Sequence, residues 1–291
     1  MSVFWFGSEP HYRLHIAPLA AAVGAEQVTN PTALPAGSWL IVASRRDART
    51  APHCNIVLIE HGAGQYYAMD AGGAHYIHDN VRLFLAPRQE VADRGASMFP
   101  NAERIVATPY LEWLGMLPRI PRHVTFTCHS NTDIAPETRS GWDHFQPGLP
   151  ALAGQFDLLL HSHPRMRNAV LKRARQLNVP YMPDWSTVAP STRVLLVDNS
   201  SVMWEACWLD IPIVILNPPW YRRDMEWGMR FWDYADTGPN VEHPADMVNT
   251  VASVIDDDIW VERRREVADL VYENVPGSTA HATEAVVHLS S

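Results

Sequence analysis

The chain has 291 residues, of which 47% are hydrophobic and 19% are charged, and its formal net charge is −9 with the histidines neutral. This composition is typical of a globular protein and excludes a disordered chain, and the lack of an apolar run of about 18 residues excludes a membrane span. The acidic balance argues against a general basic coat for nucleic acid, although it does not exclude one local basic groove.

In the first part of the chain, short apolar runs alternate with stretches of helical character. The apolar runs predict strands at Val3–Gly7, Trp39–Ala43, Asn55–Glu60, Val81–Ala86 and Arg104–Thr108. The other stretches predict helices at Tyr12–Val23, between the last two of these strands as far as about Met98, and at Pro109–Leu114. Strands that alternate with helices indicate βαβ units and a mostly parallel sheet.

Two prolines interrupt this pattern in the segment from Leu117 to Arg122. Pro118 and Pro121 favour an extended connection over a helix or a central strand. We therefore expect a linker at residues 118–122, with a first domain at residues 1–117 and a second domain at residues 123–291.

The alternation restarts after the linker. Strands are predicted at Val124–Cys128, Asp157–His161, Val194–Val197 and Ile213–Leu216. Helices are predicted at Asn168–Leu177, Ser201–Leu209, Pro244–Ile255, Ile259–Tyr272 and Thr279–Leu289. The sequence thus predicts an α/β protein of two Rossmann-like, doubly wound domains that face a central cleft. In such sheets, ligands bind beyond the carboxyl ends of the strands.

One polar turn, Asp198-Asn-Ser-Ser201, joins a predicted strand to a predicted helix. Ser200 and Ser201 present hydroxyls and backbone N–H groups at the start of the helix, which suits a phosphate or diphosphate. Glu205 follows one turn later, where its carboxylate can accept hydrogen bonds from sugar hydroxyls. The alternative is an ordinary helix cap, because Asp and Ser are the usual capping residues.

A second candidate segment, His161-Ser-His163-Pro-Arg165, follows the strand around Leu158. Arg165 can add a bidentate contact to a phosphate. A histidine at a strand end is, however, often structural. A metal site at His161 and His163 lacks an evident third ligand.

A third candidate segment, His61-Gly62-Ala-Gly64, ends a strand of the first domain. A histidine with a pKa near 6.5 can take a proton from an alcohol as the alcohol attacks. Gly62 and Gly64 leave room for a ligand near the backbone, on the acceptor side. The loop is not a dinucleotide fingerprint, because the third glycine is missing.

A fourth candidate segment begins at Trp220 and Tyr221. Arg222 and Arg223 can reach phosphates, and the aromatic residues, with Trp227, can stack on a base or a sugar. A solvated arginine pair beside core aromatic residues is the alternative. Gly238-Pro239 lies further along the same stretch.

These four segments, in the order in which they follow one another along the chain, resemble the CDP-glycerol glycerophosphotransferases, which build wall teichoic acids on a GT-B fold. They resemble more distantly the non-hydrolysing UDP-N-acetylglucosamine 2-epimerases. The resemblance implies that His163, Ser200, Ser201 and Glu205 bind a nucleotide-diphospho donor, and that His61 is the general base. It runs from about Asn55 to the C-terminus. Residues 127–150 match poorly, so His129, Asn131, Asp133 and Trp142 have no counterpart.

We therefore expect a transferase that moves a sugar or glycerol-phosphate group from a CDP- or UDP-linked donor to a hydroxyl-bearing acceptor. Helix amides and arginine would stabilise the leaving group, so that neither a metal nor a further cofactor is required. The sequence has no convincing pair of aspartate ligands, and Asp256–Asp258 is interpreted as the solvated start of a helix.

Three rival functions remain open. A sugar-nucleotide 2-epimerase on the same fold would need acid/base carboxylates in the first domain, where Glu60 and Asp70 are available. A glycosyltransferase for hydroxymethylated DNA bases would need a cleft lined by arginine, although the acidic net charge argues against it. A non-catalytic nucleotide-sugar-binding protein would bind without turnover.

The cysteines and the N-terminus bear on the cellular compartment. Cys54, Cys128 and Cys207 are far apart and odd in number, so they predict neither a metal site nor a disulfide framework, and they fit a reducing compartment. The N-terminus shows no secretory signal, and the chain shows no basic or amphipathic membrane-targeting helix. We expect a cytoplasmic protein without integral membrane contact.

Overall fold

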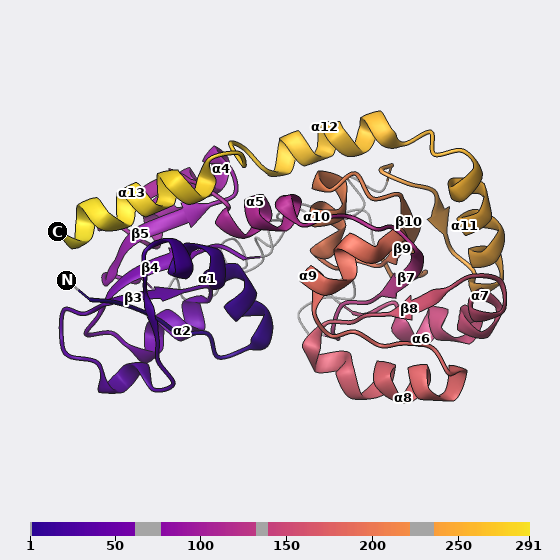
Figure 1. Ribbon diagram of the computed structural model, residues 1–291, viewed down its shortest axis with the longest axis horizontal. Coiled ribbons are helices and arrows are strands. Elements are labelled where there is room, and N and C mark those ends of the chain that lie inside the picture. The colour runs from indigo at the N-terminus through magenta and orange to yellow at the C-terminus, as the bar shows by residue number, and fades with distance from the viewer. Residues whose placement is uncertain (1, 62–76, 132–138, 222–235) are drawn as a thin grey trace. The chain divides into compact units, whose positions relative to one another are not determined.

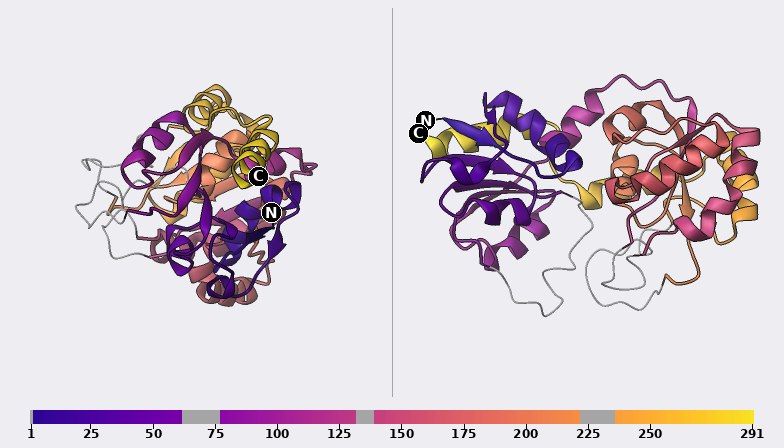
Figure 2. Two further views of the ribbon diagram at one scale, coloured as in Figure 1. Left: turned by 90° about the vertical axis from the view of Figure 1, so that its left-hand side faces the viewer. Right: turned by 90° about the horizontal axis from the view of Figure 1, so that it is seen from below.

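The computed structural model describes residues 2–61, 77–131, 139–221 and 236–291, and the chain forms two compact units (Figure 1; Figure 2). Unit 1 takes in the described residues up to Met116 together with Val271–Ser291. Unit 2 takes in the described residues from Leu117 to Leu270. Among the described residues, no helix has the length and apolar character needed to cross a membrane.

Unit 1 is built on a six-stranded parallel sheet with the order β2-β1-β3-β4-β5-β6. Its strands are β1 (Val3–Trp5), β2 (Glu26–Gln27), β3 (Trp39–Val42), β4 (Asn55–Ile59), β5 (Val81–Ala86) and β6 (Glu103–Val106). Its helices are α1 (Pro10–Ala22), α2 (Arg45–Thr50), α4 (Gln89–Arg94), α5 (Pro109–Met116) and α13 (Ser278–Ser290).

The core of unit 1 explains why the C-terminal helix belongs to it. Alternate residues of a strand point to opposite faces of the sheet, and Ile41, Val57 and Leu83 point to the face that α1 covers. Ala282 and Val286 of α13 are fully buried in the same cluster. The chain thus returns to unit 1 at its end. The expected second domain, residues 123–291, was therefore drawn too long, since residues 271–291 pack in unit 1.

Unit 2 is built on a five-stranded parallel sheet with the order β11-β10-β9-β7-β8. Its strands are β7 (His123–Thr127), β8 (Leu158–Leu160), β9 (Thr192–Val197), β10 (Ile213–Leu216) and β11 (Asn240–Val241). Its helices are α6 (Trp142–Phe145), α7 (Leu149–Gln155), α8 (Arg167–Leu177), α9 (Trp185–Val188), α10 (Val202–Trp208) and α11 (Met247–Asp256). Helix α12 (Val261–Val271) carries the chain back to unit 1.

The predicted fold class is confirmed, because both units are α/β with parallel sheets. Every predicted strand is present, most within one or two residues of its expected ends. Two-residue strands at the sheet edges and several short helices were not predicted, namely β2, β11, α2, α6, α7 and α9. These elements are too short for a periodic pattern to stand out.

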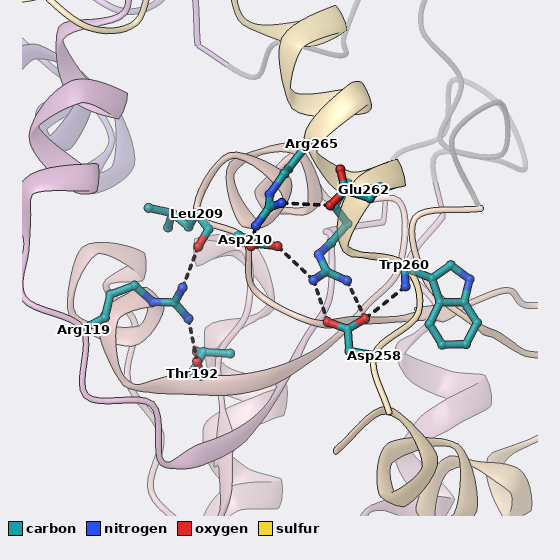
Figure 3. A network of polar contacts seen from close by, with 9 residues as sticks. Arg119, Thr192, Leu209, Asp210, Asp258, Trp260, Glu262 and Arg265 are labelled. Carbon is teal, nitrogen blue, oxygen red and sulfur yellow. Dashed lines mark hydrogen bonds and ion pairs between the residues drawn. The ribbon is translucent and has the colours of Figure 1, made fainter. Parts of the chain in front are cut away.

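The start of α12 is fixed to unit 2 by a buried arginine (Figure 3). The guanidinium of Arg264, 1% exposed, donates to both carboxylate oxygens of Asp258, at 2.8 and 2.6 Å, and to Asp210 Oδ1 at 2.9 Å. Arg119 lies nearby and donates to the carbonyl oxygens of Leu209 and Thr192. Asp258 is therefore an ion-pair partner outside any helix, which corrects the prediction of a solvated helix start at Asp256–Asp258.

We expect Arg264→Met to lower the free energy of unfolding by about 2–3 kcal/mol, because it leaves Asp258 and Asp210 without a buried cation. The partial exposure of both carboxylates keeps the loss below that of a fully buried pair. Arg265→Met is the matched control, since the Arg265 side chain is 57% exposed and also pairs with Asp210. Urea denaturation measures both variants, and equal losses would contradict the role of burial.

Candidate functional site

Three loops of unit 2 gather at one edge of its sheet. β7 is hydrogen-bonded to both β8 and β9, and all three strands run parallel, so their carboxyl ends lie side by side. The loop after β8 carries His163, the loop after β7 carries His129, and the turn after β9 carries Ser200. The rings of His129 and His163 are 5.3 Å apart between centroids.

The tautomer of His163 follows from its local hydrogen bonds. Its backbone N–H donates to the carbonyl oxygen of Cys128 at 2.9 Å, which fixes the β8 loop against the β7 loop. Its Nδ1 accepts the backbone N–H of Arg165 at 3.2 Å. An imidazole whose Nδ1 accepts carries its proton on Nε2. Nε2 of this half-buried ring is therefore a donor of the kind that suits a phosphate oxygen.

A buried carboxylate joins the loops to one another. Asp198 is fully buried and accepts the backbone N–H of His129 at 2.8 Å and that of Gly141 at 2.9 Å. It also accepts a hydrogen bond from the backbone of Ser200. Burial raises the pKa of Asp198 to about 6, against the lowering effect of these hydrogen bonds. Asp198 therefore holds the β7 loop, the start of α6 and the Ser200 turn together.

The capping alternative for the serine turn is not what the structure shows at Ser201. Ser201 is the residue at the start of α10, and its side chain makes no capping hydrogen bond to the helix. Ser200 and Glu205 are both buried. In this turn the side chain that accepts a backbone N–H is that of Asp198, which accepts from Ser200.

His129 and Asp198 were missed as site residues by the sequence analysis. His129 Nδ1 lies 2.8 Å from the carbonyl oxygen of Ser130, so Nδ1 donates and Nε2 is the acceptor when the ring is neutral. Burial lowers the pKa of His129, and the charge of Arg165 lowers it further, which places Arg165 within electrostatic reach. The available signal was the polar residues after the β7 strand, at the same sheet edge as the other two loops.

His161 is a structural residue. Its Nδ1 lies 2.7 Å from Thr127 Oγ1, and burial lowers its pKa to about 4, although Asp184 opposes that shift. No group of three or more His, Cys, Asp or Glu side chains in the described part of the chain is arranged to hold a metal ion. The alternative of a metal site at His161 and His163 therefore gains no third ligand there.

In unit 1, His61 lies two residues after the end of β4, one residue further on than predicted, and it lies among aromatic rings. Its ring centroid is 4.5 Å from that of Tyr12 in an edge-on contact, 5.8 Å from that of His11 and 6.0 Å from that of His15. Burial, together with the charges of His11 and Arg45, lowers the pKa of His61 to about 3, although a hydrogen bond with the backbone of Ala43 opposes the shift. The ring is therefore neutral at pH 7, as a general base must be, but its basicity is weak.

The other predicted site residues have different outcomes. Gly62, Gly64, Asp70, Asp133, Arg222, Arg223 and Trp227 lie outside the described residues. Tyr221 is buried, and its hydroxyl donates to the carbonyl oxygen of Arg139 at 3.1 Å. Gly238 packs directly on the backbone of Ile213, where a Cβ would collide with the carbonyl oxygen. The Gly238-Pro239 pair thus has a packing reason that needs no ligand.

The buried ionisable groups predict how stability depends on pH. Burial lowers the pKa of five histidines, so the unfolded chain binds protons below about pH 6.5 that the folded chain does not. These residues are His15, His61, His78, His129 and His161.

Two carboxyls act in the opposite sense, because burial raises the pKa of Glu60 to about 7 and that of Asp198 to about 6. Since the histidines outnumber them, we expect the melting temperature to fall as the pH falls from 7 to 5. Differential scanning calorimetry across this range tests the sign, and a protein that becomes more stable on acidification would contradict it.

Neither a model of a known protein family nor a curated protein matches this chain. Solved structures do match it. One is the wall teichoic acid polymerase TagF, with a TM-score of 0.62 and 12% identity over 99% of this chain and 89% of the other. The fold is GT-B-like. Two further matches have the same fold at equally low identity.

The UDP-GlcNAc 2-epimerase of Neisseria meningitidis, solved with UDP-GlcNAc, matches with a TM-score of 0.59 and 13% identity over 100% of this chain and 99% of the other. S. aureus MnaA, solved with UDP, matches with a TM-score of 0.57 and 11% identity over 100% and 97%. At such identities the likeness establishes the fold and leaves the chemistry to be argued from the residues.

Proposed function

We propose that the protein binds a nucleotide-diphospho donor through unit 2 and transfers a sugar or glycerol-phosphate group from it to an acceptor hydroxyl. The observation that carries this proposal is the set of polar loops held together at one edge of the unit 2 sheet by Asp198. In parallel α/β sheets this edge is where ligands bind. The ligands named for the solved matches include UDP, UDP-GlcNAc and the CDPG of a soaked TagF structure. These ligands are of the class proposed here as the donor.

Each proposed donor residue has a chemical reason for its role. His163 offers an Nε2–H donor to the diphosphate, and Arg165 adds a cation near His129. Ser200 and Ser201 offer hydroxyls from the turn that Asp198 orders, and Glu205, one turn further along α10, offers a carboxylate to sugar hydroxyls. Arg222 and Arg223 remain proposals from the sequence. Hydrogen-bond donors and arginine would stabilise the departing nucleotide.

A metal-independent reaction is part of the proposal, because hydrogen-bond donors and arginine take the place of a bound cation at the leaving phosphate. We expect the turnover rate to be the same in EDTA as in magnesium, at constant ionic strength. A rate lost in the chelator and restored by magnesium or manganese would contradict this part.

The donor class is tested by thermal stability with CDP-glycerol, UDP-sugars and GDP-sugars. A ligand present at about 100 times its dissociation constant adds about 2.7 kcal/mol to the free energy of unfolding. We expect a CDP- or UDP-linked compound to raise the melting temperature. A protein that none of these compounds stabilises would contradict donor binding.

For His163→Ala we expect the dissociation constant of the donor to rise roughly 5–150-fold, because a contact worth about 1–3 kcal/mol is lost. Isothermal titration calorimetry with CDP or UDP measures the change. His243→Ala is the matched control, since His243 is an exposed histidine of unit 2 that caps no helix with its side chain. Equal affinities in the two variants would remove His163 from the donor site.

A sugar-nucleotide 2-epimerase is the second candidate, and Glu60 is the observation that favours it. This carboxyl directly precedes His61, and burial raises its pKa to about 7, which suits a group that gives and takes protons near neutral pH. NMR analysis of UDP-GlcNAc incubated with the protein alone separates the two functions. Formation of a C2 epimer without any acceptor would favour the epimerase over the transferase.

A further inference from the structure

His61, the proposed general base, belongs to a cluster of three histidines with His11 and His15. The proposed reaction gives no role to the other two. His11 and His15 stand one turn apart on α1, and both rings lie within 6.0 Å of the His61 ring, measured between centroids. The ring of His15 also lies 4.2 Å from that of Tyr110 on α5. Helix α1 and the residues after β4 therefore bring three imidazoles together, and Tyr110 of α5 packs against one of them.

A fixed cation, the guanidinium of Arg45, lies near this cluster. The charge of Arg45, at the start of α2, reaches both His61 and Glu60. Arg45 Nη1 lies 3.4 Å from Met98 Sδ, and Arg45 forms no ion pair with a carboxylate of the described residues. Burial raises the pKa of Glu60, the residue before His61, to about 7, so this carboxyl supplies only part of a negative charge at neutral pH.

We infer that His11, His15 and His61, together with Arg45, bind an oxyanion carried by the acceptor, so that the acceptor is an anionic alcohol bearing a phosphate or a carboxylate. The inference rests on the proposed transferase function. Its physical reason is complementarity: three imidazoles and one guanidinium that disfavour each other's positive charge are stabilised by a bound negative charge.

Binding of such an anion would also correct the weak basicity of His61. An opposite charge within about 4–6 Å raises the pKa of a histidine by roughly 1–3 units, which brings His61 closer to the working pH while it stays neutral. His61 then takes the proton of the acceptor hydroxyl as the oxygen bonds to the donor's reacting carbon or phosphorus. The bond from that atom to the nucleotide phosphate breaks, and the phosphate keeps the electron pair.

The experiment is a pH titration of ¹⁵N-labelled histidine side chains by NMR, in chloride, inorganic phosphate, acetate or CDP at equal ionic strength. We expect phosphate or acetate to raise the titration midpoint of His61 by about one unit or more, with exposed His288 as the control residue. CDP should leave His61 unchanged. No shift with phosphate or acetate, or a shift with CDP only, would overturn the inference.

Two variants in the same helix sharpen the test. In Arg45→Gln, the phosphate concentration that produces half of the His61 shift should rise at least tenfold. Arg46→Gln, at an exposed position, should leave this concentration unchanged. Equal behaviour of the two variants would remove Arg45 from the site. Calorimetry with CDP on the same samples keeps the inference separate from the proposed function, because donor binding can succeed or fail independently of the His61 shift.

Discussion

His61→Ala is expected to lower kcat by roughly 10²–10⁴-fold while the affinity for the donor nucleotide stays nearly unchanged. The physical reason is that His61 belongs to unit 1, whereas the residues proposed to hold the donor belong to unit 2. Loss of a general base raises the barrier of the chemical step without removing a contact to the donor. Steady-state kinetics, with calorimetry for nucleotide affinity, measures both quantities.

The variant needs a control for folding, because His61 packs against Tyr12 and near His11 and His15. His61→Gln keeps a polar group of similar size, and it should retain the melting temperature while losing turnover. His288→Ala removes an exposed histidine of α13 and should change neither quantity. Normal turnover in His61→Ala would exclude its role as base. Unfolding of both His61 variants would make it a structural residue.

Asp198→Asn should weaken donor binding by at least about 100-fold. An asparagine keeps one acceptor oxygen and replaces the other by an amide N–H₂ group, which would face the backbone N–H of either His129 or Gly141. The substitution loses one of these hydrogen bonds outright and removes the charge that strengthens the others. Hydrogen bonds to a charged group are worth about 1.5–3 kcal/mol each, so the total cost is about 3–5 kcal/mol, shared between loop order and stability. Calorimetry with CDP or UDP and urea denaturation measure the two parts.

The pH dependence of donor affinity shows whether Asp198 positions the donor-binding loops or only stabilises the fold. Because burial raises the pKa of Asp198 to about 6, the wild type should bind the donor more weakly as the pH falls from 7 to 5, when the carboxylate takes up a proton. Asp198→Asn should lack this part of the pH dependence. Asp143→Asn, at an exposed carboxylate of α6, should match the wild type. Wild-type affinity in Asp198→Asn would contradict the positioning role.

Much of the fold could be predicted from the sequence, because the buried strands are short apolar runs and each run is followed by a polar or glycine-containing loop. Val81–Ala86 was predicted with its observed ends, and Ile213–Leu216 likewise. The return of α13 to unit 1 was not predictable from such patterns. Periodicity shows that Thr279–Leu289 is helical, but only the packing of Ala282 and Val286 shows which sheet they cover.

The candidate site was predictable where a motif has a fixed sequence and not where it depends on tertiary contacts. His163, Ser200 and His61 stand out as polar residues directly after apolar strands. Asp198 was interpreted as part of a turn, and its hydrogen bonds to His129 and Gly141 span 69 and 57 residues. His11 and His15 sit on a helix that has no motif, and only the fold brings them to His61.

The most direct test of the central claim is a crystal structure of the protein with bound CDP or UDP. We expect the diphosphate to lie at the carboxyl ends of β8, β7 and β9, with one phosphate oxygen within hydrogen-bond distance of His163 Nε2 and another at the Ser200–Ser201 turn. A nucleotide bound at the end of β4 in unit 1, or at any place away from His163 and Ser200, would contradict the proposed donor site.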